Sequence, residues 1–89
     1  MKKWHWYVYI IACFDGTFYT GCTWNIPGRA EQHASGLGSN YTRRHGFKKL
    51  VYWEKFDDLE DARRREKQIK NWSQRKKRKL ISGEWSKEY

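Results

Sequence analysis

Near its beginning the sequence contains two apolar segments separated by a short interruption, and this pattern constrains the fold more than any other feature. Residues 6–13 (WYVYIIAC) and 17–23 (TFYTGCT) are rich in β-branched and aromatic side chains, as strands are. Phe14, Asp15 and Gly16 lie between them. The two segments therefore predict a β-hairpin.

The length of the hairpin loop decides whether Tyr9 and Tyr19 lie on the same face of the sheet. A two-residue turn would place the two phenols on opposite faces, because the side-chain period of a strand is two. A three-residue loop would pair Cys13 with Thr17 and bring both tyrosines to one face. It would also put Gly16 in the left-handed position of a bulge, which glycine fills without strain.

The middle of the chain alternates between turn signals and regular segments. Asn25 is suited to a helix cap and Pro27 to a first helical turn, so a short helix is expected over 27–34. Three glycines and several small polar residues predict a loop over 35–46. Residues 48–56 (KKLVYWEKF) alternate as a third strand does.

The last third of the sequence predicts two helices. One covers 59–72 after a cap at Asp57 or Asp58, and the other covers 74–81 after a cap at Ser73. The element order β-β-α-β-α-α indicates an α+β fold, with a small, mostly antiparallel three-stranded sheet flanked by helices.

The length of 89 residues predicts one domain over 1–89. No apolar run is long enough for a transmembrane helix, and the aromatic-rich start is not typical of a signal peptide. Two cysteines are too few for a disulfide framework or for a four-ligand zinc site. We expect a cytoplasmic protein without membrane contact, monomeric by default, although homodimerisation is compatible with the sequence.

The charge of the chain points to an anionic partner. Nineteen Lys and Arg residues against ten Asp and Glu residues give a formal net charge of +9, which favours nucleic acid. A run of basic residues is more often a solvated face, but the total charge strengthens the functional interpretation. The candidate nucleic-acid-binding residues are Tyr41, Arg43, Arg44, Arg63, Lys70, Arg75, Lys76, Lys77, Arg78 and Lys79.

One carboxylate interrupts an apolar helical stripe. Between Leu59 and Ile69, the residues spaced three or four apart form the stripe that should face the core, and Glu66 lies within it. Acidic side chains are rarely buried unless they are paired or bind a metal. Glu66 is therefore either a functional carboxylate or an edge residue paired with Arg63 or Lys70.

Several of these residues occur in an order that resembles the GIY-YIG nuclease superfamily. Tyr7-Val8-Tyr9 and Tyr19-Thr20-Gly21 are similar to the two tripeptides that name the superfamily. Arg29, His33 and Glu66 match its helix-borne arginine, a histidine of many members and its metal-binding glutamate. Small single-domain members, of the URI type or uncharacterised, resemble the wider string YVYI…DGTFYTGCT…RAEQH, YTR, KLVYWE and REKQIKNW.

The resemblance implies hydrolysis of phosphodiester bonds in nucleic acid, DNA more than RNA, with one Mg²⁺ or Mn²⁺ ion. Tyr9 would be the general base and Tyr19 would orient water or phosphate. Arg29 would contact the scissile phosphate. His33 would polarise a tyrosine or protonate a leaving group. Glu66 would hold the metal, since one carboxylate with phosphate and water suits magnesium.

The sequence also departs from the family pattern. Tyr7 replaces a glycine, Thr20 replaces an isoleucine, and a late asparagine is missing from residues 82–85 (SGEW), with Asn71 as a candidate replacement. The missing asparagine leaves a catalytically silent nucleic-acid-binding module as the alternative.

A third possibility is an adaptor of a nuclease complex. It rests on three aromatic residues near the C-terminus that we expect to be exposed, which are Trp72, Trp85 and Tyr89.

Overall fold

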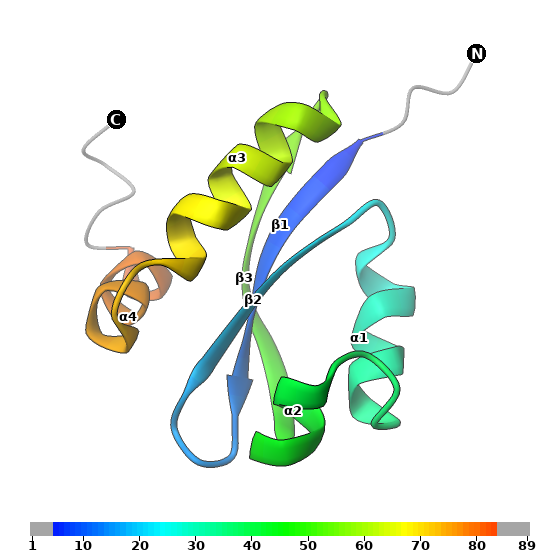
Figure 1. Cartoon of the computed structure of the whole chain (residues 1–89), viewed down its shortest axis with the longest axis vertical. Helices are drawn as coiled ribbons and strands as arrows, with labels where there is room; N and C mark the ends of the chain where they lie inside the picture. Colours follow the sequence, from blue (N-terminus) through cyan, green and yellow to red (C-terminus); the bar gives the residue numbers. More distant parts are fainter. Residues whose placement is uncertain (1–4, 84–89) are drawn as a thin grey trace.

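A computed structural model describes residues 5–83 as a three-stranded antiparallel sheet with helices on both faces (Figure 1). The strands lie in the order β2-β1-β3, so β2 is an edge strand. The elements are β1 (Trp6–Cys13), β2 (Phe18–Thr23), α1 (Ile26–Ala34), α2 (Asn40–His45), β3 (Phe47–Phe56), α3 (Leu59–Lys70) and α4 (Gln74–Ser82). The predicted α+β class and antiparallel sheet are confirmed.

The hairpin has the three-residue loop. The Cys13 amide donates to the Thr17 carbonyl at 2.9 Å, and Gly16 has a φ of 88°, in the left-handed region. Tyr9 consequently pairs with Gly21, and Tyr19 pairs with Ile11. This register brings both tyrosines to the same face of the sheet.

The predicted helices form with the caps that the sequence indicates. The side chains of Asn25, Asp58 and Ser73 accept hydrogen bonds from first-turn amides of α1, α3 and α4 respectively. Gly83 adopts a left-handed conformation after α4. These polar side chains satisfy amide groups that have no partner within the helix.

The expected loop over 35–46 was wrong in one respect, because it contains the short helix α2. Ser39 caps this helix by accepting from the Thr42 amide at 3.1 Å, and Gly46 follows its last residue with a φ of 85°. Glycine and small polar residues dominate the segment, so tertiary contacts rather than helix propensity favour this turn of helix.

Two apolar clusters lie on opposite faces of the sheet. On one face, Val8 and Ile10 of β1 pack with Ala62, Ile69 and Leu80 of α3 and α4, and all five are buried. The predicted helical stripe thus faces this core.

The opposite face of the sheet, on the side of α1 and α2 (Figure 1), carries the second cluster. Tyr9, Ile11 and Cys13 are buried there, with Tyr19 and Tyr41 packed against them. Because β2 is an edge strand, the Tyr9 phenol on this face lies near enough to Glu66 of α3 to feel its charge.

A bidentate ion pair fixes α3 on the sheet. The Arg65 guanidinium donates from Nε and Nη2 to both carboxylate oxygens of Glu54 on β3, each at 3.0 Å. The Tyr52 hydroxyl also donates to Glu54, at 2.6 Å. This clamp orients the helix that carries Glu66.

Between residues 5 and 83, no helix is long and apolar enough to cross a membrane.

Candidate active site

The phenol of Tyr9 lies across Gly21 on the edge strand. Tyr9 is 2% exposed, and a Cβ on Gly21 would stand 2.9 Å from its Cε2 atom and closer still to its oxygen. Any other residue at Gly21 would therefore displace the ring. The absence of a side chain lets the hydroxyl reach the edge of the sheet.

A chain of hydrogen bonds links Tyr9 to two helices. Its hydroxyl is 3.0 Å from Nε2 of His33 on α1, and Nδ1 of His33 is 2.7 Å from the Thr42 hydroxyl on α2. His33 and Thr42 are each 1% exposed. A Cβ on Gly38 would stand 2.6 Å from Cγ of His33, so this glycine makes room for the imidazole.

The partners of the imidazole define its protonation. Burial and the nearby Arg29 lower the pKa of His33, so the ring is neutral at pH 7. The Thr42 hydroxyl lies 3.4 Å from the Ser39 carbonyl and donates to it. That hydroxyl therefore accepts from Nδ1–H of His33, and Nε2 is left to accept the proton of the Tyr9 phenol.

Arg29, Tyr19 and Glu66 complete the surroundings of the Tyr9 phenol. Burial raises the pKa of Tyr9 well above its ordinary value of 10.0, and the neighbouring Tyr19 and Glu66 add to this rise. Arg29 opposes it through its charge and a hydrogen bond. The Tyr9 and Tyr19 ring centroids are 6.5 Å apart. The structure thus brings the five predicted catalytic residues into one site.

Glu66 has the features of one of the two alternatives that the sequence left open, an edge residue paired with a nearby cation. Its side chain is 21% exposed at the edge of the α3 stripe, and Lys70 forms an ion pair with it, Nζ to Oε2, at 3.1 Å. The Lys70 ammonium also lies 5.7 Å from the centroid of the Tyr19 ring. Glu66 therefore faces the tyrosine site with a cation beside it.

The donor set around Glu66 restricts the metals that could bind. Over residues 5–83, no three His, Cys, Asp or Glu side chains cluster as metal ligands. Glu66 as the single protein carboxylate fits an ion that keeps most of its water and binds substrate phosphate, as Mg²⁺ does. It does not fit a structural zinc site.

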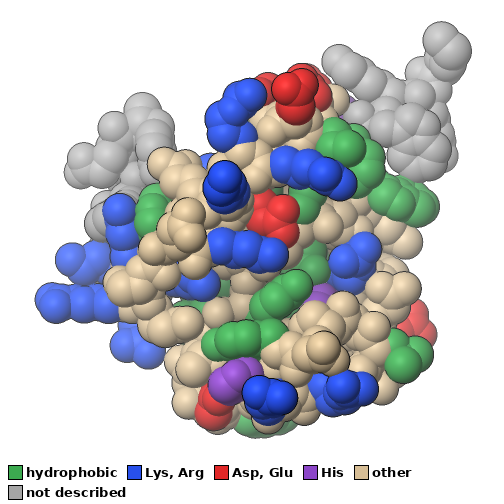
Figure 2. Space-filling view, viewed as in Figure 1, with side chains coloured by type: hydrophobic (Ala, Val, Ile, Leu, Met, Phe, Trp, Pro, Cys, Tyr) green, Lys and Arg blue, Asp and Glu red, His purple; other side chains and the backbone are tan. Residues whose placement is uncertain are grey.

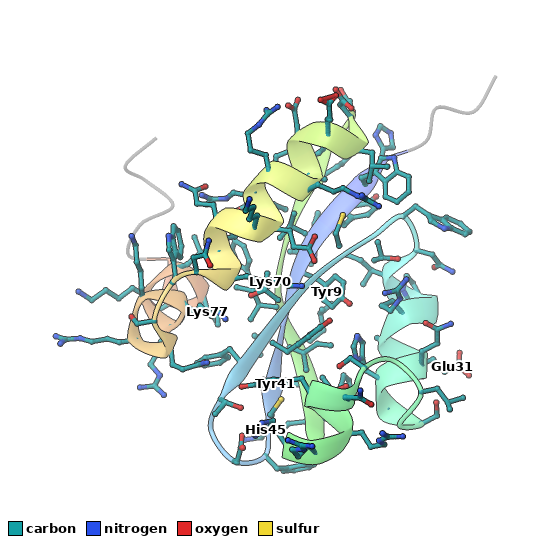
Figure 3. The ribbon with its side chains drawn as sticks, viewed as in Figure 1. Tyr9, Glu31, Tyr41, His45, Lys70 and Lys77 are labelled. Carbon is teal, nitrogen blue, oxygen red and sulfur yellow. The ribbon has the colours of Figure 1, made fainter. Side chains whose placement is uncertain are left out.

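Aromatic rings extend the site toward α2. Tyr41 lies 5.6 Å from Tyr19, centroid to centroid, and its ring stacks on His45 at 4.1 Å. Figure 3 labels Tyr41 and His45, which lie next to one another. Asp15 in the hairpin loop is hydrogen-bonded to Nδ1 of His45. Bonds from Thr17 and then His45 lower the pKa of Asp15 to about 2. The sequence indicated Tyr41 but gave no partner for His45.

The predicted basic residues are distributed over three helices. Figure 2 shows Lys and Arg side chains gathered over α3 and α4. Lys76 lies over the Trp72 ring at 4.5 Å, and Arg78 lies 5.7 Å from the Phe18 ring. Lys79 is half-buried. The exposed members are Arg43, Arg44, Arg63, Lys70, Arg75 and Arg78.

Two side chains are less accessible than the sequence suggests. Lys77, one of the candidate nucleic-acid-binding residues, is only 5% exposed, on a helix whose Leu80 packs in the core. Trp72 was expected to be exposed, but it is half-buried, with Arg65 and Lys76 over its ring. Trp85, Tyr89 and the segment around Glu84 lie outside the described residues.

Sequence reasoning missed the positions that support the histidine. Thr42 belongs to the YTR string, yet a lone threonine in an expected loop carries no sign of a buried contact. Gly38 has no distinguishing signal among the glycines of the same segment. Asn71, the candidate replacement for the missing asparagine, is an exposed residue at the C-terminal end of α3.

Fold and site together define a small α+β domain with the paired tyrosines, arginine, histidine and glutamate of the GIY-YIG type. A model of the GIY-YIG catalytic domain matches residues 5–79. The chain therefore belongs to the GIY-YIG catalytic domain family, in the UPF0213 group of small single-domain proteins.

Relatives in this group come from different organisms. UPF0213 protein BH0048 of Halalkalibacterium halodurans is 46% identical, covering 85% of this chain and 81% of its own. The UPF0213 protein of Natronomonas pharaonis is 42% identical over 88% of this chain and 92% of its own. The solution NMR structure of BH0048 covers 88% of this chain and 83% of its own, with a TM-score of 0.56.

Proposed function

We propose that the protein is a metal-dependent endonuclease that hydrolyses phosphodiester bonds in nucleic acid, with DNA as the preferred substrate. The observation that carries the proposal is the convergence of Tyr9, Arg29 and Glu66 at the edge strand, with His33 bonded behind the phenol. Membership of the GIY-YIG family and the +9 charge support the same assignment.

Tyr9 acts as the general base through His33. A phenol with a raised pKa is not ionised at pH 7, so it accepts a proton from water only while it transfers its own. Nε2 of His33, 3.0 Å away, is the acceptor of that second proton. The Nδ1–H group of His33 stays hydrogen-bonded to the Thr42 hydroxyl, and this bond keeps the tautomer in which Nε2 accepts a proton.

Arg29 stabilises the negative charge that develops on the phosphate. Its guanidinium is near enough to act on the Tyr9 phenol, so a phosphate beside that phenol also lies within its reach. Tyr19 lies on the same face and offers a second hydroxyl to orient water or phosphate.

Glu66 would hold the divalent ion, Mg²⁺ or Mn²⁺. When bound, the ion would supply charge neutralisation at the phosphate and at the leaving oxygen. Lys70, now paired with Glu66, would then be available to contact substrate.

A cleavage assay tests the proposal. Labelled single-stranded DNA, duplex DNA, branched DNA and RNA are incubated with the protein and Mg²⁺ or Mn²⁺. Glu66→Ala should abolish cleavage. Glu60→Ala, which removes an exposed carboxylate of the same helix, should cut like the wild type. Undiminished cleavage by a clean preparation of Glu66→Ala would refute the assignment.

The ion pair between Glu66 and Lys70 favours a second candidate, a catalytically silent nucleic-acid-binding module. Such a module binds DNA with a strong dependence on salt concentration and never cuts it. Binding without cleavage under both metals would establish this alternative. Metal-dependent products would exclude it.

A further inference from the structure

A cleft runs between the free edge of β2 and the α3–α4 turn, beside the tyrosine site. Its volume is about 320 Å³. Thr20 and Tyr19 line it from β2, and Lys70 and Lys77 line it from the helices. Figure 3 shows Lys77 on α4 and Lys70 on α3. We name this hollow the Lys77 cleft.

Lys77 is a buried cation without an acidic partner among residues 5–83. Burial lowers its pKa, and Lys70 lowers it further. Lys70 has its own carboxylate, Glu66, at 3.1 Å. Removing an unpaired ammonium from water is costly, so a lysine in this position destabilises the fold unless an anion joins it.

A second polar group in the cleft also lacks a partner. The Thr20 hydroxyl is buried, with the residue 1% exposed, and it makes no hydrogen bond within the described part of the chain. Gln74 lines the same cleft, and its side-chain oxygen accepts from the Phe18 amide at 2.8 Å. Buried hydroxyl groups normally have a partner. Thr20 and Lys77 therefore both line the cleft, and within the described residues neither the hydroxyl nor the ammonium has a polar partner.

We propose that the Lys77 cleft is a phosphate-binding subsite, distinct from the position of the scissile phosphate, in which Lys77 and Thr20 bind a neighbouring phosphate of the substrate strand. Phosphate oxygens accept from both groups and neutralise the ammonium. Tyr19 borders the cleft and also belongs to the tyrosine site, so the two positions are continuous. The proposal rests on the proposed function only for the source of the phosphate.

Binding measurements in EDTA, without divalent metal and hence without cleavage, test the subsite. Inorganic phosphate is titrated into labelled protein, and the NMR signals of Thr20 and Lys77 should shift. Affinity for a short DNA strand is then compared between wild type, Lys77→Met and Lys79→Met. Lys79 is half-buried on the same helix and lies outside the cleft, so its variant controls for loss of one charge.

Lys77→Met should weaken DNA binding about tenfold, as loss of a hydrogen bond to a charged group does. Lys79→Met should weaken it about twofold, as loss of a charge outside the cleft does. The melting temperature of Lys77→Met should stay the same or rise, because an unpaired buried charge is gone. Equal losses in the two variants would overturn the proposal, as would an unchanged affinity in Lys77→Met.

Thr20→Val supplies an independent variant. It keeps the shape of the side chain and removes the hydroxyl, so phosphate binding should weaken while stability is kept or raised. Phosphate binding equal to wild type would contradict a role for Thr20. The outcomes also separate the two proposals. Phosphate shifts at Thr20 and Lys77 in a protein that never cuts would support the subsite and refute the nuclease proposal. Cleavage without those shifts would support the nuclease proposal and refute the subsite.

Discussion

The phenol of Tyr9 occupies the space that a side chain on Gly21 would need. The two residues pair across β1 and β2, and a Cβ on Gly21 would stand 2.9 Å from Cε2 of the ring. Steric overlap with the Tyr9 ring therefore explains why the last residue of the second family tripeptide is glycine in this chain. This glycine allows the tyrosine of the first tripeptide to reach the edge of the sheet.

Gly21→Ala should displace the Tyr9 ring and destabilise the fold by about 1–3 kcal/mol, the usual cost of overpacking. Cleavage should fall further than the stability loss explains, because the phenol moves away from His33. Urea unfolding and the cleavage rate measure the two effects.

Gly16→Ala is the matched control for this substitution. Gly16 has a φ of 88° but open space around it, so alanine should cost about 1–2 kcal/mol of backbone strain and leave the site unchanged. Equal cleavage losses in the two glycine variants would show that activity follows stability alone.

Tyr9→Phe keeps the ring and removes the hydroxyl. If Tyr9 is the base, the cleavage rate should fall by about 10²–10⁴-fold, the usual contribution of proton transfer. Stability should fall by only about 1–3 kcal/mol, because Nε2 of His33 loses its partner. Single-turnover cleavage and thermal unfolding give the two values. A rate within a few-fold of the wild type would transfer the role of base to another group.

Thr42→Val tests the tautomer of the imidazole. Without the hydroxyl, Nδ1–H of His33 is buried and unpaired, which should cost about 1–3 kcal/mol and lower the cleavage rate. Thr42→Ser keeps the hydroxyl and should retain most of the stability and most of the cleavage rate. The NMR shifts of the two imidazole nitrogens report the tautomer directly. A neutral Nε2–H form in the wild type would contradict the proposed direction of proton transfer.

The parts of this protein that the sequence predicted are those with local causes. Alternating apolar residues and a three-residue loop with Gly16 determine the hairpin, and side chains such as Ser73 cap the helices. Periodicity placed Glu66 within a buried stripe and left open an edge position paired with Lys70, and the structure has this pair. The order of the family residues then indicated a single site, and the sheet register brings its two tyrosines, Tyr9 and Tyr19, to one face.

The parts that the sequence did not predict depend on contacts between distant segments. Thr42, the partner of His33, lies on α2, whose sequence has weak helix propensity. The sequence therefore predicted neither this helix nor the contact between Thr42 and His33. Lys77 belongs to a run of five basic residues, and only the packing of α4 separates the buried member from the rest. Such burial is a property of tertiary structure and leaves no local pattern.

The lowered pKa of His33 predicts how the protein responds to acid. Between the folded pKa and the unfolded value of 6.5, the unfolded chain binds more protons than the folded one, so stability rises with pH through this window. The contribution of His33 is complete above pH 6.5 and is lost as pH falls toward the folded pKa. Urea unfolding from pH 4 to 8 should show this slope, and His33→Gln should lack it.

The same titration governs cleavage, because only neutral His33 accepts the phenolic proton of Tyr9. The acid limb of the pH–rate profile should therefore lie below pH 6.5. Since the pKa of Tyr9 is raised above 10.0, direct ionisation of the phenol adds no further rise at neutral or mildly alkaline pH. Single-turnover rates at saturating metal trace this profile. A rate that climbs steadily from pH 7 to 9 would mean that ionised Tyr9, and not the neutral pair of Tyr9 and His33, is the base.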